Sequence, residues 1–335
     1  MSVTIRDVAR AAGVSTATAA RALGGYGHAS PAARRKVSES ARRLGYRPNV
    51  VARALVSRAT TTVGLVVGDI ENPFFAAAAR GLADVMDAHG YTVLLANADE
   101  DAGRERRAVD ALRARQVDGM VVVPAPGASP EHLAELVAAG VPLVLLDRVV
   151  VGVAADSVLA RNVAGARAAV AHLAGLGHRR IGVVSDSPEI TSSAERIQGY
   201  RQALRAIGIA PEPGLISIGG PTRDDGEAAA LRLLDRPDRP TAVFTANNFM
   251  TVGALRAARS LGLRIPEDVA LVGFDDLDWT TLVQPPVTVV RQPVADLGRV
   301  AGERLLRRLE GDAGPPKRIR LDANLIVRGS CGAGA

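Results

Sequence analysis

Residues 4–21 of this chain read TIRDVARAAGVSTATAAR, a pattern of two short helices separated by a glycine turn. Thr4 is a good N-cap, and Asp7 stands three residues later, in the position that completes a capping box. Gly13 can take the left-handed conformation that the turn needs, and a second helix is expected near residues 16–23. The pattern predicts a helix-turn-helix, a motif that lays its second helix in the major groove of DNA.

The exposed face of this second helix carries the side chains that we expect to contact DNA. Arg21 can form a bidentate pair with guanine O6 and N7, worth about 1–3 kcal/mol of discrimination between bases. Its alternative is a solvated surface arginine. Thr16 can bond a base edge or touch a thymine methyl group, whereas Ala17 can supply only apolar contact. Ser15, the expected N-cap, and Thr18 complete the set of expected contacts.

A third helix is expected between Ser30, its N-cap, and Gly45, which ends it. Residues 46–58, YRPNVVARALVSR, follow, with Asn49 as the cap of a short helix that carries Leu55. A helix this short is marginal in water, so we expect it to order on DNA. Leu55 would then enter a minor-groove step and kink the duplex.

The distribution of charge supports DNA binding by the N-terminal part alone. Residues 1–60 hold 11 Lys and Arg against two acidic residues, whereas the remainder holds 30 basic and 33 acidic residues. A basic head on a slightly acidic body is typical of nucleic-acid binding. A GC-rich genome would explain the many arginines but not the scarcity of acids.

The length of 335 residues favours a small domain followed by one large or two medium domains. The apolar runs are short, so no membrane span is expected, and the first seven residues lack the apolar core of a signal peptide. The cytoplasm is therefore the expected compartment. The single cysteine, Cys331, has no partner for an internal disulfide, and neither a metal site nor a cofactor is expected.

From residue 63 onward, short apolar strands alternate with longer helical stretches. The first set has expected strands at 63–67, 92–96, 120–123 and 143–146, with helices at 75–90, 103–115 and 130–139. The second set has expected strands at 181–184, 215–218, 242–245, 269–273 and 287–290, with helices at 163–176, 195–207, 225–234 and 250–261. Two runs of β-α units predict two lobes with parallel sheets, in which ligands bind beyond the carboxyl ends of the strands.

Polar and aromatic residues stand at those strand ends. Carboxylate, amide and guanidinium groups that can bond adjacent hydroxyls, beside an aromatic face, predict a sugar pocket. Phe74 and Trp279 would cover the apolar face of the sugar. Asp147 as a helix cap, Phe74 as a core residue and Asp275 as a turn residue are the structural alternatives. The candidate effector residues are Asn72, Phe74, Phe75, Asp147, Arg148, Arg196, Asn247, Asp275, Trp279 and Gln292, and Asp69, Asn248 and Asp276 also follow strands.

The chain resembles the LacI/GalR family of transcription regulators over essentially its whole length. The resemblance is carried by TIRDVARAAGVS, by the connector ARRLGYRPN, by the segment ARAL and by the candidate effector residues, which are similar to the polar set of ribose-type sugar-binding proteins. It implies a small all-α helix-turn-helix head and an α/β two-lobed body of periplasmic-binding-protein-like fold with parallel sheets. The implied bounds are 1–58 for the head and 59–335 for the body, with one lobe at about 62–160 and 291–318 and the other at about 161–290 and 319–330.

The resemblance also implies a function. A homodimer would bind a palindromic operator in double-stranded DNA, one head to each half-site, and a repressor is the favoured type of regulator. Arg21 and Thr16 match positions that contact bases in the family, and His28 matches a loop position that contacts DNA. Leu55 matches the hinge-helix leucine that enters the minor groove at the operator centre. No leucine heptad follows Arg328, so a dimer rather than a tetramer is expected.

The implied effector is a monosaccharide or a close derivative, bound between the lobes. Three crossovers of the chain, near 158–161, 289–292 and 318–322, would let the lobes rotate as rigid bodies about it. Some relatives use a purine or a protein co-regulator instead, and this alternative stays open.

Several residues depart from the family pattern. Ala19-Ala20 replaces the usual Val-Ser before the reading arginine, and Gly24 replaces a frequent asparagine. Val56 follows Leu55 at a position where some members have lysine, so recognition of the central base pairs is expected to depend on DNA shape. Arg161 stands where relatives commonly have aspartate, and this charge reversal at a lobe crossover alters either the choice of effector or the strain of the hinge.

Three other classes of protein fit the sequence less well. An enzyme is disfavoured because the chain has no Walker loop, dinucleotide fingerprint, nucleophile elbow or metal-spaced histidines. A sugar-binding protein without a regulatory role would not explain the basic head. A nucleoid-type DNA binder would not explain the pocket.

Overall fold

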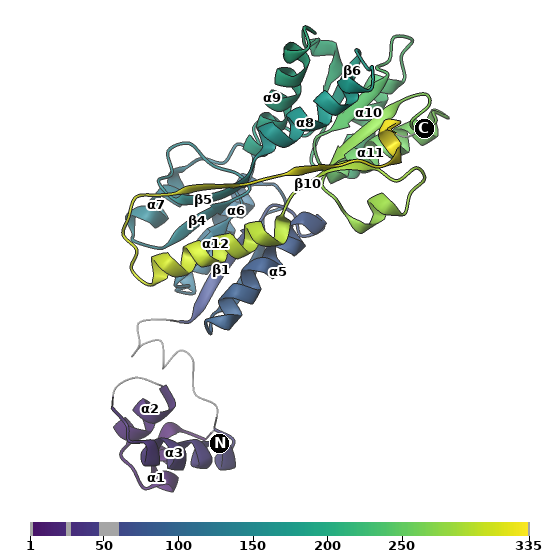
Figure 1. Cartoon of the computed structure of the whole chain (residues 1–335). Coiled ribbons are helices and arrows are strands. Elements are labelled where there is room, and N and C mark those ends of the chain that lie inside the picture. Colours follow the sequence, from purple (N-terminus) through teal and green to yellow (C-terminus); the bar gives the residue numbers. More distant parts are fainter. Residues whose placement is uncertain (1–2, 25–27, 47–59, 334–335) are drawn as a thin grey trace. The chain divides into compact units, whose positions relative to one another are not determined.

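The computed structural model describes residues 3–24, 28–46 and 60–333 (Figure 1). Helices α1 (Ile5–Ala12), α2 (Thr16–Gly24) and α3 (Pro31–Leu44) make up the head as far as it is described. A body of two α/β lobes follows in the sequence. Within the described residues no helix is both long and apolar enough to cross a membrane.

The helix-turn-helix of the head is stabilised by a capping box, a glycine turn and a small apolar core. The Asp7 carboxylate accepts hydrogen bonds from the Thr4 backbone N–H at 3.0 Å and from the Thr4 hydroxyl at 2.7 Å, which fixes the start of α1. Gly13 ends α1 with a φ of 66°, a conformation that favours glycine. Val8, Ala19 and other small apolar residues of the three helices form one buried cluster.

The first lobe contains a six-stranded sheet in the order β11-β5-β4-β3-β1-β2, in which β11 pairs with β5, β5 with β4, β4 with β3 and β3 with β1, all parallel. Its helices cover both faces of the sheet. The strands are β1 (Thr62–Val67), β2 (Thr92–Asn97), β3 (Gly119–Val122), β4 (Leu143–Leu146), β5 (Asp156–Ala160) and β11 (Arg318–Leu321). The helices are α5 (Pro73–Ala88), α6 (Ala102–Ala114), α7 (Glu131–Ala138) and α12 (Val294–Leu309).

The second lobe repeats this plan with the order β12-β10-β9-β8-β6-β7, in which β10 and β12 pair antiparallel and the other neighbours pair parallel. The strands are β6 (Ile181–Ser185), β7 (Ile216–Ile218), β8 (Ala242–Thr245), β9 (Ala270–Phe274), β10 (Thr288–Arg291) and β12 (Asn324–Ile326). The helices are α8 (Asn162–Gly175), α9 (Thr191–Ala206), α10 (Arg223–Leu234) and α11 (Asn248–Ser260), with short 3-10 turns at Pro213–Leu215, Asp278–Thr281 and Gly329–Cys331.

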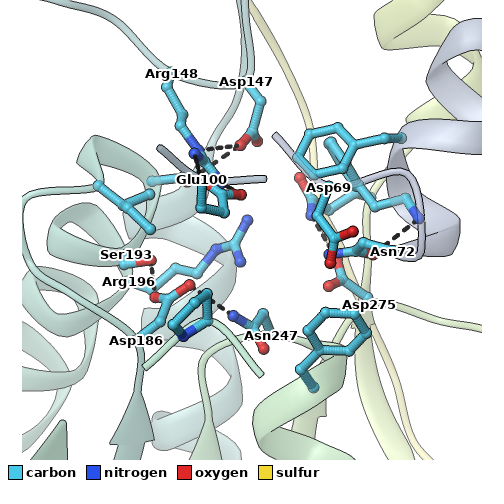
Figure 2. A pocket seen from close by; sticks show the side chains of 17 residues that line it. Asp69, Asn72, Glu100, Asp147, Arg148, Asp186, Ser193, Arg196, Asn247 and Asp275 are labelled. Atoms are coloured by element: carbon cyan, nitrogen blue, oxygen red, sulfur yellow. Dashed lines mark hydrogen bonds and ion pairs between the residues drawn. The ribbon is translucent and has the colours of Figure 1, made fainter. Parts of the chain in front are cut away.

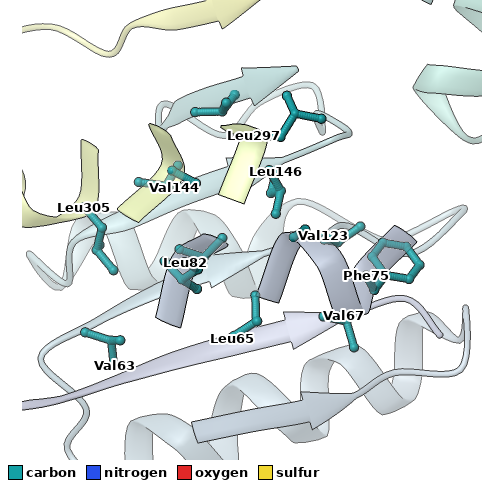
Figure 3. Close-up of a cluster of buried hydrophobic side chains, with 14 of the residues drawn as sticks. Val63, Leu65, Val67, Phe75, Leu82, Val123, Val144, Leu146, Leu297 and Leu305 are labelled. Atoms are coloured by element: carbon teal, nitrogen blue, oxygen red, sulfur yellow. The ribbon is translucent and has the colours of Figure 1, made fainter. Parts of the chain in front are cut away.

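The core of the first lobe joins segments that lie far apart in the sequence. Figure 3 shows Leu65 of β1, Leu82 of α5 and Leu297 of α12 in one buried cluster. Helices α5 and α12 can approach this closely because Gly81 and Gly298 have no side chains, and a Cβ atom at either position would clash with the backbone of the facing helix. Helix α12, which follows most of the second lobe in the sequence, therefore completes the core of the first lobe.

The chain passes between the two sheets three times. It leaves the first sheet after β5, returns after β10, and leaves again between β11 and β12. The last passage differs from the expected lobe boundary, because Arg318–Leu321 pairs with β5 and so still belongs to the first sheet. Three passages of the chain therefore connect the two lobes.

Candidate functional site

The head presents the expected DNA-reading side chains on α2. Thr16, Ala17 and Arg21 are exposed, and His28 is exposed in the part of the loop that is described. Ser15 and Thr18 are bonded to each other, because the Ser15 hydroxyl accepts the Thr18 N–H at 3.1 Å and lies 2.9 Å from the Thr18 hydroxyl. Ser15 is therefore the N-cap of α2. The remaining two expected contacts, Asn49 and Leu55, lie outside the described residues.

A polar pocket lies between the two lobes, beyond the carboxyl ends of their strands (Figure 2). Its wall contains nine of the ten expected effector residues, and Trp279 is the exception. Side chains from both sheets contribute. The lining residues are Asp69, Asn72, Phe74, Phe75, Glu100, Asp147, Arg148, Asp186, Ile190, Ser192, Ser193, Arg196, Pro221, Asn247, Phe249, Asp275 and Gln292.

Asn72 and the two phenylalanines that follow it form the wall on the α5 side. The Asn72 side chain caps α5 by accepting the Phe74 N–H at 3.0 Å, and Pro73 occupies the first turn. Phe74 and Phe75 are buried and pack edge to face, with ring centroids 5.2 Å apart. The cap therefore sets the position of both rings at the pocket.

Asp147 and Asp275 occupy equivalent places in the two lobes. Each follows a strand in a left-handed conformation, with φ of 64° and 77°, and each donates its N–H to the neighbouring strand at 2.9 Å, to Val158 and Val290 respectively. Such backbone costs about 1–3 kcal/mol and persists where the surrounding structure enforces it, often at ligand sites. The two lobes thus aim one carboxylate each at the pocket.

Two buried arginines supply the positive charge of the pocket. Arg148 holds the Glu100 carboxylate in a bidentate pair, at 2.5 and 2.8 Å. Arg196, on α9, donates to the Asn162 side chain at 2.9 Å and to the Ala246 carbonyl at 2.6 Å. Its guanidinium also lies 3.9 Å from the centre of the Phe274 ring and points into the pocket in Figure 2. Both arginines are thus fixed by protein partners.

Asp186 and Asn247 form the polar wall of the second lobe. Asn247 caps α11 by accepting the Met250 N–H at 2.9 Å, and its amide donates to Asp186 at 2.8 Å. Ser193 donates to the other Asp186 oxygen. Asn247 is therefore held from both ends of its amide, in one orientation.

One carboxylate oxygen and one amide oxygen in the pocket wall lack a hydrogen-bond donor. Burial raises the pKa of Asp147, which the nearby Arg148 opposes, and burial also raises the pKa of Asp186. Among the described residues, the Asp147 Oδ1 and Gln292 Oε1 atoms are buried without a hydrogen-bond partner. Buried acceptors normally have donors, so the pocket wall is suited to a ligand that brings hydroxyl groups.

The two walls also bond to each other across the pocket. The Ser192 hydroxyl of the second lobe donates to Asp147 at 3.2 Å, and the Asn248 amide donates to Asn72 at 3.0 Å. The structure is thus a closed arrangement of the lobes.

Comparison with known proteins places both parts of the chain. Residues 4–49 match the family described as bacterial regulatory proteins, lacI family, and residues 170–331 match the periplasmic binding protein-like domain. Catabolite control protein A of Priestia megaterium is 36% identical over 98% of this chain and 99% of its own. The chain belongs to the LacI family.

Solved structures agree with this LacI-family assignment. The lac repressor dimer bound to operator and the anti-inducer ONPF superposes with a TM-score of 0.87, at 27% identity over 99% of both chains. The complex of the transcriptional regulator CelR with cellobiose gives a TM-score of 0.75, at 35% identity over 98% of this chain and 99% of that one. The expected family, fold and absence of an enzymatic role are confirmed: this is a DNA-binding transcriptional regulator with a periplasmic-binding-protein-like sensor.

Trp279 of this LacI-family regulator is not at the pocket, which corrects the sequence-based expectation. The turn after β9 directs it to a separate groove against α11, where it packs partly buried beside Leu255 and Val283. Phe249 provides the aromatic surface of the second lobe instead, with the Arg223 guanidinium 4.4 Å from its ring centre.

Sequence reasoning missed several lining residues of the regulator. Asp186 follows β6, and Glu100 comes shortly after β2, so the rule that polar residues at strand ends form the site would have found both. Phe249 gave no such signal, because an aromatic residue inside a helix is usually a core residue. The other missed residues are Ile190, Ser192, Ser193 and Pro221.

The unusual Arg161 is paired at the lobe crossover. Its side chain lies 2.8 Å from Asp322, on the adjacent passage of the chain, and both side chains are largely exposed. Its neighbour Asn162 is fully buried and holds Arg196. The charge reversal is therefore matched on the surface, and Asn162 alone of the two reaches the pocket residues.

Proposed function

We propose that this chain is a repressor that binds a palindromic operator as a homodimer and is controlled by a monosaccharide or close derivative in the pocket between its lobes. The observation that carries the proposal is the pair of inward-facing carboxylates, Asp147 and Asp275, one from each lobe, beside the buried Arg196. A ligand that bonds both carboxylates links the lobes, so its binding depends on their relative orientation.

The chemistry of the wall favours a compact polyhydroxylated effector. The Asp147 and Gln292 oxygens that lack partners would accept hydroxyl protons, and Arg196 would donate to a hydroxyl or ring oxygen. Phe74, Phe75 and Phe249 would cover the apolar face of a sugar ring. CelR is solved with cellobiose, a related class of molecule.

The effector would act by shifting a population of lobe arrangements. The pocket encloses about 40 Å³, whereas sites for small molecules usually measure about 300–1,000 Å³. The lobes must therefore part before the effector enters, which breaks the Ser192–Asp147 and Asn248–Asn72 bonds. Only the difference in effector affinity between the arrangements can alter DNA binding.

The head supplies sequence recognition in this proposal. Arg21 and Thr16 are exposed on α2, where a major-groove helix presents its side chains. One head reads one half-site, so a palindrome requires two copies, as in the lac repressor structure, which is a dimer on its operator.

Two steps test the proposal. Selection from random-sequence duplexes should recover a palindrome, and a panel of sugars, sugar derivatives and nucleosides should then include a compound that changes affinity for that duplex. Arg196→Ala should abolish the response without weakening DNA binding, while Arg201→Ala, an exposed position on the same helix, should leave it unchanged. A normal dose-response in Arg196→Ala would place the effector elsewhere.

A further inference from the structure

The segment that leads from the head into β1 is held by the loop in front of β3. Asp118 Oδ1 accepts the Thr60 N–H at 2.8 Å and the Thr60 hydroxyl at 3.1 Å, and Oδ2 accepts the Thr62 N–H at 3.4 Å. The Asp118 N–H donates to the Thr62 carbonyl at 2.8 Å, and the Thr60 hydroxyl also lies 3.1 Å from the Gln116 carbonyl. We call these four residues, Thr60, Thr62, Gln116 and Asp118, the clasp.

Two residues at the clasp have an unusual backbone conformation. Thr61 and Gln116 are left-handed, with φ of 50° and 57°, a conformation that non-glycine residues adopt only where their surroundings enforce it. The ladder of β1 and β3 continues directly from the clasp, with Val63 opposite Gly119. Because Asp118 bonds both ends of the three-residue segment from Thr60 to Thr62, it sets the path along which the chain enters β1.

Helix α6 ends at the clasp and begins at the effector pocket. Asp101 caps the helix, and Glu100, the residue before it, holds Arg148 in the pocket wall. At the end of the first turn the buried Glu105 carboxylate accepts the Ala125 N–H and pairs with the His132 ring, which anchors the helix to its lobe. A helix of this length spans about 20 Å, so one rigid element joins two distant groups of polar contacts.

We propose that α6 transmits the state of the effector pocket to the head, with Glu100 as its pocket end and the Asp118 clasp as its head end. This inference rests on the proposed function. An effector hydroxyl or carboxylate that bonds Arg148 competes with Glu100 for the guanidinium. Any change in that pair moves the start of a rigid helix, and therefore the clasp at its end. Asp118 acts here as a positioning residue, since it is not among the residues that line the pocket.

The first test is a double-mutant cycle that needs no effector. Glu100→Gln, Asp118→Asn and the double variant are made in the full-length chain, and fluorescence anisotropy measures affinity for the duplex recovered by selection. Substitutions this far apart with no shared partner normally combine to within about twofold. Transmission through α6 predicts a double variant that departs at least fivefold from the product of the single effects. Agreement within twofold would overturn the inference.

A matched pair controls for nonspecific effects. Asp110 is exposed on α6 and lies between the two ends, so Glu100→Gln combined with Asp110→Asn should follow the product rule. Thr60→Val removes the hydrogen bonds of the Thr60 hydroxyl and keeps Asp118. It replaces Asp118→Asn in the cycle if Asp118→Asn melts at a lower temperature than the wild type.

Hydrogen exchange gives a second readout that a merely structural role would not move. Glu100→Gln should speed amide exchange at Thr60 and Thr62, about 20 Å away along α6, while exchange in the centre of β1 stays slow. Unchanged exchange at both threonines would overturn the inference. A selection that recovers no preferred duplex would instead refute the proposed function, and the exchange experiment would still decide the role of α6.

Discussion

Arg21 is the residue on which base discrimination by the head should depend. It is exposed on α2 and can reach the two acceptors of a guanine edge. Arg21→Ala should lower the preference for the selected operator over its variants at one base pair by about 1–3 kcal/mol. Arg35 is exposed on α3, outside the expected reading helix, and is expected to contact phosphate, so Arg35→Ala should weaken all duplexes alike. An unchanged base preference in Arg21→Ala would assign readout to other residues.

Asp147 should make effector binding depend on pH. Burial raises its pKa in the unliganded protein, and hydroxyl donors from an effector would stabilise its charged form and lower that pKa. Binding then releases a proton, so effector affinity should rise with pH between the bound and free pKa values and level off above them. Calorimetric titration of the effector from the panel at several pH values measures this.

The control for the pH effect is a carboxylate outside the pocket. Asp147→Asn should weaken binding and flatten its pH dependence, because the titrating group is removed. Asp278→Asn, at an exposed position, should retain the wild-type profile. An Asp147→Asn profile as steep as that of the wild type would assign the proton to Asp186, whose pKa is also raised by burial.

At the scale of elements, the β-α alternation was predictable because apolar strands and amphipathic helices differ in period. Every strand expected before residue 290 lies within two residues of an observed one. The sequence analysis did not identify β5, β11, β12 or α12. Strand β5 begins with a charged residue, β11 reads RIRL with alternating charge, and α12 carries arginines and two glycines on its length. Their structure comes from tertiary pairing rather than local pattern.

Helix α12 packs on α5 only because its glycine permits it. A Cβ at Gly298 would clash with the Ala78 carbonyl, so Gly298→Ala should destabilise the body by roughly 1–3 kcal/mol, as overpacking does. Gly175, at the end of α8, has open space around its Cβ position, so Gly175→Ala should be neutral or stabilising. Urea denaturation measures both. Equal stability of the two variants would show that α5 and α12 can move apart to accommodate the added Cβ at little cost in free energy.

The junction of β5 with α12 should weaken in acid. Burial alone would raise the pKa of Asp156, but hydrogen bonds from Arg308, from the Lys317 N–H and from Arg304 hold that pKa below its ordinary value. A lowered pKa contributes stability that is complete above the unfolded value, about 3.9, and is lost as pH falls through the folded value.

Asp156→Asn tests this junction. Removal of one partner from a buried ion pair costs about 3–5 kcal/mol, because Arg304 remains buried. The difference in unfolding free energy between wild type and variant should be constant at pH 7 and 5 and should shrink below pH 4. A constant difference down to pH 3 would mean that the folded protein does not lower the pKa of Asp156.

At the scale of the whole molecule, the effector pocket was largely predictable, and its cross-lobe contacts were not. The strand-end rule located Asn72, Asp147 and Asp275 because topology alone brings strand ends together. The bond between Asn248 and Asn72 joins residues 176 positions apart in different lobes and depends on the closure angle, which no local pattern encodes. The predicted position of Trp279 was wrong for a related reason, since the direction of the turn after β9 decides which surface its side chain contacts.

The proposed homodimer predicts that one exposed surface becomes buried, and the second lobe offers a candidate. Leu282 is 79% exposed and stands beside a groove of about 810 Å³ that Val252, Leu255, Trp279 and Val283 line with arginines of α11. An apolar side chain this exposed next to an apolar groove is typical of a protein contact. Leu282→Glu should therefore shift the protein toward monomer in analytical ultracentrifugation. It should also lower the affinity for the palindromic operator more than the affinity for a single half-site, because the second head of a dimer binds at a high effective concentration once the first head is bound. Leu176→Glu, at the exposed leucine that follows α8, should leave the mass and both affinities unchanged. A fully dimeric Leu282→Glu protein would move the dimer contact to another face.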